Sequence, residues 1–176
     1  MIEKLPLSLF VRHMNYKAEG LGIDATMGMP LAGLTHAIKQ VVSVARESME
    51  ASNLDGIRWI VDDALKFVNR EARRGNQYHG IILDPPAYGR GPDGEKWVLQ
   101  DHLDELLAAC RDLLNPDQHF LILNLYSLGF SALISQSLAQ THYTEMGSTI
   151  AAGELYLPDD AGRSLPLGTY LRVHKV

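Results

Sequence analysis

The sequence predicts an α/β fold, an open sheet of mostly parallel strands covered by helices. Short strands that are apolar on both faces alternate with amphipathic helices along residues 57–140, and this alternation is typical of a buried parallel sheet. The tail, residues 143–176, breaks the alternation with two consecutive strand-like runs. The turn sequence Asp159-Asp160-Ala161-Gly162 separates these runs, which predicts an antiparallel hairpin at one edge of the sheet.

Each element follows from the local apolar pattern. Apolar residues at three- and four-residue steps predict helices, and short apolar runs that end at Gly, Pro or Asp predict strands. Asp63 is expected to cap the helix that follows it. The apolar run 5–11 fits a strand or one helical turn, and residues 87–100 form a polar, glycine-rich loop. The expected helices are 31–52, 64–75, 103–114 and 130–140, and the expected strands are 57–61, 80–83 and 119–125.

Length and composition set the class of protein. The chain has 176 residues, which fits one domain over residues 1–176. Hydrophobic residues make up 46% and charged residues 21%, which excludes a disordered chain. A single cysteine excludes a disulfide framework and a zinc site built from several thiols. No apolar run approaches the roughly 20 residues needed to cross a bilayer, so we expect no membrane partner and a cytoplasmic location.

The charge of the chain bears on its partners. The formal net charge is −5 and the pI is near 5.8. Domains that bind a nucleic-acid backbone unaided usually carry a basic face. The overall charge therefore does not support an RNA partner, and RNA binding would require a local basic patch. The seven histidines show no pair at metal-ligand spacing, so we expect no metal site.

The most informative motif is Asp84-Pro85-Pro86, which follows the strand 80–83. Two prolines lack N–H donors and cannot extend a ladder of strands. They hold the carboxylate and its neighbouring carbonyls at the edge of the sheet, where ligands of open α/β sheets bind. Tyr88 adds a face on which a ring can stack. The structural alternative is a proline-rich loop that only ends a strand.

Two further motifs follow predicted strands. Asp62 and Asp63 are adjacent carboxylates, which repel unless one faces water or a donor. A helix cap at Asp63 explains the motif structurally, and acceptance of an adenine amino group is the functional alternative. The segment Asp24-Ala25-Thr26-Met27-Gly28 fits a loop that a cofactor approaches or a plain turn, because it has only one glycine of the usual fingerprint.

Residues 56–107 resemble class I S-adenosylmethionine-dependent methyltransferases, above all in the segment DPPAYGRGPDGEKW. More narrowly, they resemble the branch of the large-subunit rRNA cytosine methyltransferases. The tail GELYLPDDAGRSLPLGTYLR is similar to the closing hairpin of that branch. The resemblance runs from about Thr35 to the end of the chain. It implies a Rossmann-like sandwich, S-adenosylmethionine as cofactor, and methyl transfer to a nucleobase in rRNA.

The resemblance and the motifs together assign the site. In the family, the acid after the third strand accepts from the adenine amino group, and the fourth-strand corner lies between methyl donor and acceptor. Asp84 and Tyr88 are the expected catalytic residues. Arg90 and Lys96, with Tyr88, are expected to meet the substrate, because they follow the Asp84 corner and can meet an anion. The expected cofactor-binding residues are Asp24, Gly28, Asp62, Asp63, Ala64, Asp84, Pro85 and Pro86.

The sequence also departs from the family. Its members have a glycine-rich loop, a helix and a second strand that ends in an acid holding the ribose hydroxyls. Before residue 52 this chain leaves little room for them, so its first strands are expected to be incomplete and no acid is assigned to the ribose. Tyr126-Ser127-Leu128 stands where the cytosine enzymes carry a nucleophilic cysteine. The alternative hypothesis is therefore an inactive remnant that keeps the fold without binding a cofactor.

Overall fold

The computed structural model describes residues 9–11, 26–28, 43, 46–53, 60–90, 96–126 and 129–176. The strands are β1 (Leu9–Val11), β2 (Thr26–Gly28), β3 (Ile60–Asp62), β4 (Gly80–Leu83), β5 (Tyr88–Arg90), β6 (Lys96–Val98), β7 (His119–Leu125), β8 (Thr149–Pro158) and β9 (Ser164–Lys175). The helices are α2 (Ala64–Arg73), α3 (Leu99–Arg111) and α4 (Ala132–Tyr143), followed by the short 3₁₀ turn η1 (Thr144–Met146). Residues 46–51 are also helical.

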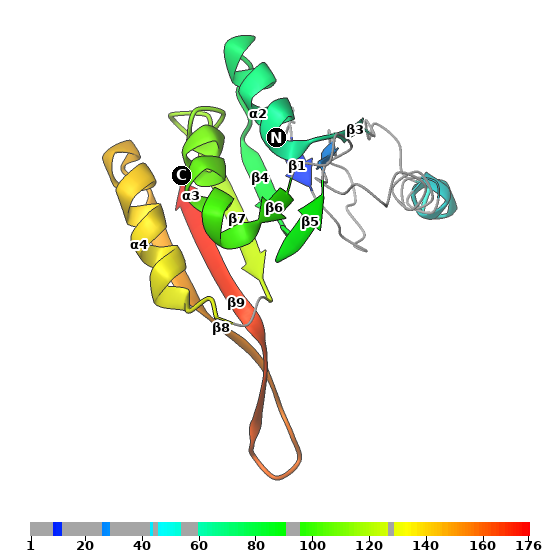
Figure 1. Ribbon diagram of the computed structural model, residues 1–176, viewed down its shortest axis with the longest axis vertical. Coiled ribbons are helices and arrows are strands. Elements are labelled where there is room, and N and C mark those ends of the chain that lie inside the picture. The colour runs from blue at the N-terminus through cyan, green and yellow to red at the C-terminus, as the bar shows by residue number, and fades with distance from the viewer. Residues whose placement is uncertain are drawn as a thin grey trace, which may run out of the picture.

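The main sheet has five strands in the order β1-β4-β7-β9-β8 (Figure 1). Strands β1, β4 and β7 pair in parallel, and β9 pairs antiparallel with both β7 and β8. A second parallel pair, β2 and β3, lies beside the β1 edge, where β2 contacts β1. This topology confirms the predicted parallel sheet and the predicted antiparallel hairpin at its edge.

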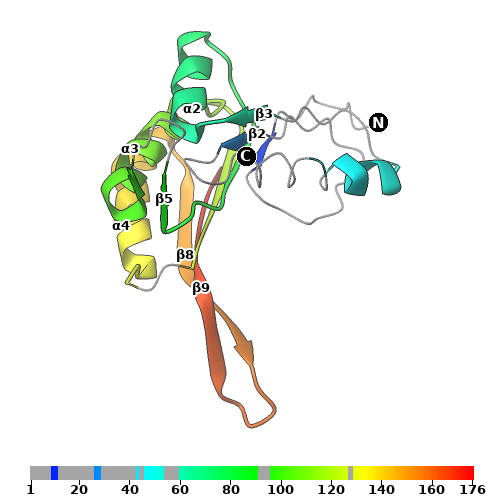
Figure 2. The ribbon, with the colours of Figure 1, turned by 45° about the vertical axis from the view of Figure 1, so that its right-hand side comes forward.

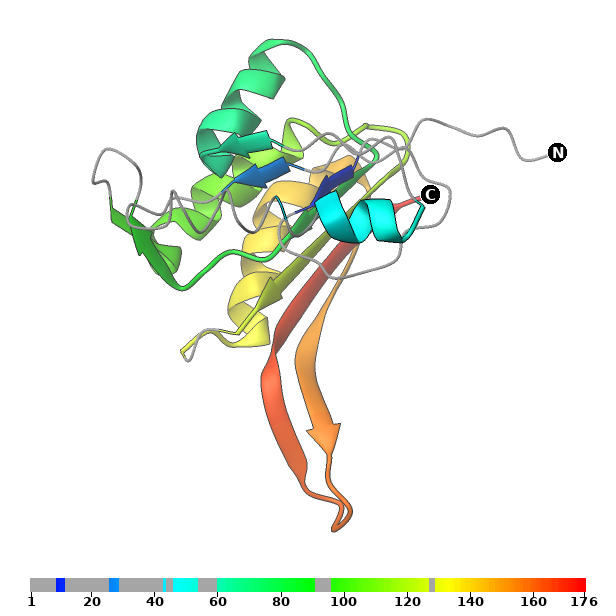
Figure 3. The same ribbon diagram turned by 90° about the vertical axis from the view of Figure 1, so that its right-hand side faces the viewer.

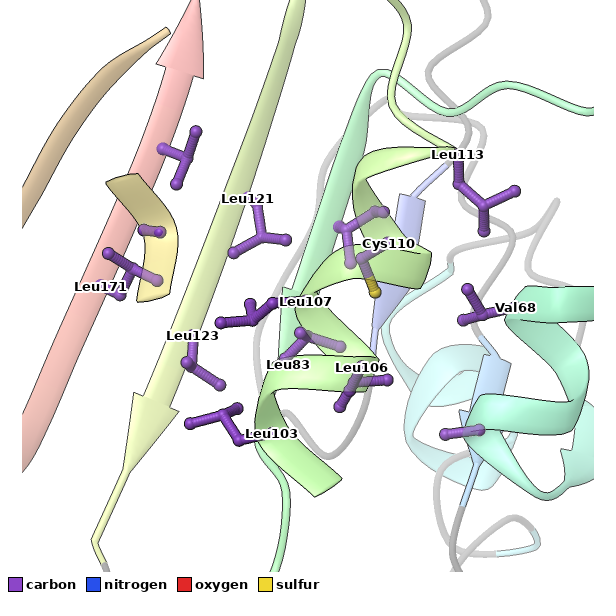
Figure 4. Packing of buried hydrophobic residues seen from close by; sticks show 14 of the residues in the cluster. Val68, Leu83, Leu103, Leu106, Leu107, Cys110, Leu113, Leu121, Leu123 and Leu171 are labelled. Carbon is purple, nitrogen blue, oxygen red and sulfur yellow. The ribbon is translucent and has the colours of Figure 1, made fainter. Parts of the chain in front are cut away.

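Helices α2, α3 and α4 lie together on one side of the sheet, and the helical residues 46–51 lie on the other side (Figure 2). The core lies between the sheet and these three helices. In β7, Leu121 and Leu123 are buried whereas Ile122 between them is 38% exposed, because successive side chains of a strand point to opposite faces. Figure 4 shows both leucines directed toward Leu103 and Leu107 of α3. No helix in the described part of the chain has the length and apolarity to cross a membrane.

Two parts of the fold differ from the expectation. The predicted loop 87–100 contains the antiparallel pair β5–β6, and α3 begins at Leu99 instead of Leu103. Strands of three residues carry no readable period, so this hairpin has no signal in the sequence. The first strands, expected to be incomplete, are present but short, since β1 and β2 span three residues each.

His119, the first residue of β7, is buried and bonded at both ring nitrogens. Its Nδ1 lies 2.6 Å from the Asn115 carbonyl oxygen and its Nε2 lies 2.8 Å from the Ser148 hydroxyl. Because a carbonyl only accepts, Nδ1 donates to it, and in the neutral ring Nε2 then accepts from the Ser148 hydroxyl. Burial lowers the pKa of His119, the bond to Asn115 opposes this, and the charges of Lys175 and His174 lower the pKa further.

The lowered pKa predicts that the protein loses stability in acid. As the pH falls below the ordinary histidine pKa of 6.5, the unfolded chain binds a proton that the folded chain takes up only at lower pH. The free energy of unfolding should therefore decrease from about pH 8 to about pH 5. Urea denaturation across this range should show a shallower decrease for His119→Gln, which keeps one donor and one acceptor. Equal slopes for the two proteins would contradict the assignment.

Candidate functional site

The candidate site lies at the carboxyl ends of the parallel strands, the edge at which open α/β sheets bind ligands. Gly28 and Asp62 are partners in the register of β2 and β3, and both are the last residues of their strands. In the main sheet, Leu83 of β4 pairs with Leu123 of β7. Asp84 and Asn124 come next along these strands, so polar side chains follow the paired leucines at this edge.

The acid pair at the end of β3, Asp62 and Asp63, forms hydrogen bonds within the protein. The Arg70 guanidinium donates to Asp62 Oδ2 at 2.5 Å, and the Asp63 backbone N–H donates to Asp62 Oδ1 at 2.9 Å. Asp63 Oδ1 accepts from the Lys66 backbone N–H at 2.8 Å, which is the geometry of an N-cap. The predicted cap is thus confirmed, and the donor that relieves the repulsion between the two acids is Arg70.

These contacts leave acceptor capacity for a ligand. A carboxylate has two oxygens with about four lone-pair sites, and the cap accounts for one site on Asp63. Ala64, the first residue of α2, is buried directly behind the cap. The end of β3 therefore combines a carboxylate with a small apolar side chain, a pair that suits the amino group and ring of a purine.

The corner after β4 is fixed from two sides. On one side, the amide of Asn124 in β7 donates to Asp84 Oδ1, with a donor–acceptor distance of 3.2 Å. On the other side, the indole N–H of Trp97 in β6 donates to the Pro86 carbonyl at 2.8 Å, and the Leu99 N–H donates to the Ala87 carbonyl at 3.0 Å. Trp97 is buried and stacks on the His102 ring at 5.1 Å. The hairpin β5–β6 therefore closes onto the corner that the two prolines create, and Pro85 is buried beneath it.

The predicted substrate residues lie on this hairpin. Tyr88 begins β5 and is 68% exposed, so its ring is accessible to a ligand. Arg90 and Lys96 are cross-strand partners at the far end of the hairpin. The position of the Arg90 side chain is outside the described residues, whereas Lys96 is exposed.

A cavity of about 220 Å³ joins the end of β3 to this hairpin. Two lysines, Lys66 and Lys96, and the imidazole of His102 line this cavity. The cavity therefore brings cations next to the Asp63 cap in a chain of negative net charge. It is lined by Asp63, Leu65, Lys66, Asn69, Lys96, Trp97 and His102.

The structure resembles solved methyltransferases. A SAM-dependent methyltransferase from Agrobacterium tumefaciens is 31% identical with a TM-score of 0.81, and the match covers 98% of this chain and 57% of that protein. The chain has the class I methyltransferase fold. SMU.776, a candidate methyltransferase solved in complex with SAH, is 16% identical with a TM-score of 0.67. A SAM-dependent methyltransferase-like protein from Streptococcus mutans is 14% identical with a TM-score of 0.64.

The chain spans 57% of the length of the Agrobacterium protein and 38% of each of the other two, which themselves match 86% of this chain. No protein-family model and no curated protein matches the sequence. The comparison therefore rests on the solved structures. They support the class I methyltransferase fold but do not distinguish one branch of it.

The structure separates the two acidic corners of the site. The corners at Asp62-Asp63 and Asp84 do not close neighbouring strands, because β2 and β1 lie between β3 and β4. The cavity beside Asp63 is accordingly lined by the hairpin and not by Asp84. Gly28 ends the second strand and does not lie in a loop after the first. Asp24 lies outside the described residues.

Arg70 and Trp97 are site residues that the sequence analysis missed. Arg70 lies seven residues after the cap residue Asp63, which is close to two helical turns. This spacing places Arg70 on the helix face of the acid pair, so its contact with Asp62 could have been predicted. Trp97 had none, because its partner Pro86 lies in a loop with no periodic pattern. Among the described residues, no group of three or more His, Cys, Asp or Glu is arranged to hold a metal ion.

The bond between Trp97 and Pro86 can be tested with Trp97→Phe, which keeps an aromatic ring against His102 but removes the indole N–H. The Pro86 carbonyl then loses its donor, and we expect a loss of about 1–2 kcal/mol in the free energy of unfolding. Trypsin should also cleave faster after Arg90 and Lys96, because the hairpin loosens. Urea denaturation and timed proteolysis measure the two effects.

Tyr143→Phe is the matched control, since it removes the buried hydrogen bond from Tyr143 to the Leu107 carbonyl, away from the corner. It should reduce stability similarly without increasing cleavage in the hairpin under native conditions. Equal cleavage in both variants would show that the Trp97 bond does not hold the corner.

Proposed function

We propose that this chain is the catalytic domain of an S-adenosylmethionine-dependent methyltransferase that modifies a nucleobase in RNA, with rRNA as the substrate class. The observation that supports this most is the Asp84-Pro85-Pro86 corner, held between Asn124 and Trp97 beside the exposed ring of Tyr88. The likeness to the Agrobacterium methyltransferase agrees with it. Cytoplasmic action is part of the proposal.

The residues at the carboxyl edge fit this cofactor. Asp63 and Ala64 would hold the adenine, Asp62 ends the strand that leads into them, and Gly28 ends the neighbouring strand β2. Gly28 adds no side chain that would block a nucleoside at this edge. When bound, S-adenosylmethionine supplies a methyl group on a sulfonium sulfur, which is reactive without further activation.

The chain's own residues would position the acceptor. Asp84 and the adjoining carbonyls can accept hydrogen bonds from the amino group of a nucleobase, and Tyr88 offers a face on which that base stacks. Holding the two reactants in line accounts for most of what such a site must do. A base in paired RNA would first have to leave its stack. Lys96 and Arg90 would contact phosphates on the same strand.

A second candidate is the inactive remnant, and one observation favours it. The second strand ends at Gly28, where the resemblance leads us to expect an acid that holds the ribose hydroxyls. The carboxylates of Asp62 and Asp63 at the end of β3 also have partners within the protein. A fold that keeps these contacts for stability alone would show the same geometry around Asp62 and Asp63.

Calorimetric titration with S-adenosylhomocysteine separates the two candidates. The methyltransferase should bind this product with micromolar affinity, and Asp63→Asn should weaken binding about tenfold or more. This substitution is sharper than alanine, because asparagine still caps the helix while its charge is removed. Asp117→Asn, an exposed residue outside the site, should bind as the wild type does. Absence of heat and of a thermal shift at millimolar ligand would leave only the remnant.

A further inference from the structure

Helix α2 concentrates positive charge in a chain whose net charge is −5. Residues 64–74 hold four cations and one carboxylate: the cations are Lys66, Arg70, Arg73 and Arg74, and the carboxylate is Glu71. The cations stand at the spacing i, i+4, i+7, i+8, which is one face of a helix, whereas Glu71 is buried on the opposite side. The outer face of α2 is therefore basic.

Two of the four cations are neutralised by acids of the protein, and one of the others is not. Arg70 pairs with Asp62 at 2.5 Å, and Arg74 pairs with Glu71 at 2.8 Å. The exposed Arg73 donates from Nε to a backbone carbonyl one turn earlier, at 3.2 Å. Among the described residues it pairs with no carboxylate, so the outer N–H groups of its guanidinium can bind another anion.

The first half of α2 faces strand β6 across the cavity beside the candidate site. Lys66 and Asn69 line this cavity from α2, and Lys96 lines it from β6; all three are exposed. In Figure 1 the first turn of α2 lies near β6, and the helix runs from there to the top of the molecule. Arg73 lies one turn beyond Asn69, so the four side chains form a continuous surface, the basic strip: Lys66, Asn69, Arg73 and Lys96.

Acidic groups lie beside the strip and at the far end of the molecule. Asp63 lines the same cavity and caps α2 with one oxygen. Asp101 and Glu105 of α3 are exposed but line no part of the cavity. The acidic turn between β8 and β9 lies at the opposite end of the molecule from α2 (Figures 1 and 3). An anion would therefore follow α2 and avoid α3.

The groups of the strip suit a chain of phosphates. Lysine and arginine form charge-assisted hydrogen bonds to phosphate oxygens, and an asparagine amide also donates to them. Lys66 and Arg73 are separated by two helical turns, about 10 Å along the axis. This is the length of about three nucleotides in a stacked strand, so the strip fits a nucleic-acid backbone better than one small anion.

An aromatic ring near the end of the strip favours a nucleic acid over an acidic protein. Lys96 and Tyr88 belong to one hairpin, because β5 and β6 pair with each other, and Tyr88 is 68% exposed. Proteins that bind single-stranded nucleic acid combine cations along the backbone with aromatic rings on which bases stack. An acidic peptide has no base to place on such a ring.

We propose that the basic strip binds the backbone of the single-stranded RNA whose target base reaches Tyr88. The assignment rests on the proposed function and adds the path of the strand, which passes Lys96 and follows α2 to Arg73. It also reconciles an RNA substrate with an acidic chain, because the phosphate contacts are confined to one local basic surface.

Fluorescence anisotropy with a labelled single-stranded RNA of about 12 nucleotides tests the strip. The wild type should bind with a dissociation constant of about 1–100 μM at about 50 mM salt, and binding should weaken as salt is added. R73Q/K96Q removes a charge from each end of the strip. It should bind about tenfold or more weakly, and the slope of log K against log salt should become smaller by about 1.4.

R163Q/R172Q is the matched control, because it removes the same net charge elsewhere. Arg163 lies at the turn between β8 and β9, and Arg172 is the register partner of Ile122, on the sheet face away from the three helices. The control should bind the RNA as the wild type does, and circular dichroism should be unchanged for both variants. A wild type that does not bind the RNA, or a control that loses as much affinity as R73Q/K96Q, overturns the proposal.

The single variants test whether α2 takes part. Arg73→Gln alone should produce about half of the change in slope, since each lost phosphate contact counts about equally. If Lys96→Gln alone reproduces the whole loss, binding along α2 is wrong. If a polyglutamate peptide of equal charge displaces the RNA as well as unlabelled RNA does, the strip is a surface for an acidic protein and the proposal is wrong.

Titration of the wild type with S-adenosylhomocysteine separates this inference from the proposed function. If the wild type binds this nucleoside but its RNA affinity does not depend on Arg73 and Lys96, only the basic strip is wrong. If it binds no nucleoside while the strip variants lose RNA affinity, the strip is supported as an RNA surface and the methyltransferase function is wrong.

Discussion

The hydrogen bond from the Trp97 indole to the Pro86 carbonyl is the contact on which the geometry of the carboxyl edge depends. Two prolines end β4 without N–H groups, so the chain leaves the sheet there and its carbonyls need donors from elsewhere. Trp97 and the Leu99 N–H supply them. Because Trp97 belongs to β6, the same bond fixes the hairpin that presents Tyr88 and sets the residue at which α3 begins.

The acid pair at the end of β3 has a structural role that leaves acceptor sites for a ligand. Asp63 caps α2 with one oxygen, and Asp62 is held by Arg70 from two turns further along the helix. Neither contact exhausts its carboxylate, so a ligand can share acceptors that already have a structural role. For this reason the geometry alone is compatible with both an enzyme and a remnant, and binding of the nucleoside is what separates them.

Beyond the end of β7, the hairpin β8–β9 continues as an exposed arm, residues 154–167. It is the continuation of the hairpin that closes the sheet beyond β7, so its direction is fixed by the register of β7 with β9. At the point of departure Gly168 approaches the Leu125 carbonyl so closely that a Cβ would lie 2.4 Å from its oxygen. A side chain there would force the two strands apart.

Local signals in the sequence predicted much of the fold. Apolar spacing predicted α2, α3 and α4 within a few residues, β4 and β7 followed from short apolar runs, and the cap at Asp63 followed from its place before a helix. The turn at residues 159–162 predicted the hairpin β8–β9. These features depend on neighbours within a few positions, so the sequence alone determines them.

The tertiary structure decided how these pieces meet. The separation of β3 from β4 by two other strands, the place of Gly28 opposite Asp62, and the bond from Trp97 to Pro86 all join distant segments. No local pattern records such pairings, because a hydrogen bond or a strand register depends on where the whole chain brings two groups. The same holds for the exposure of the arm, because its apolar residues by themselves predict a buried strand.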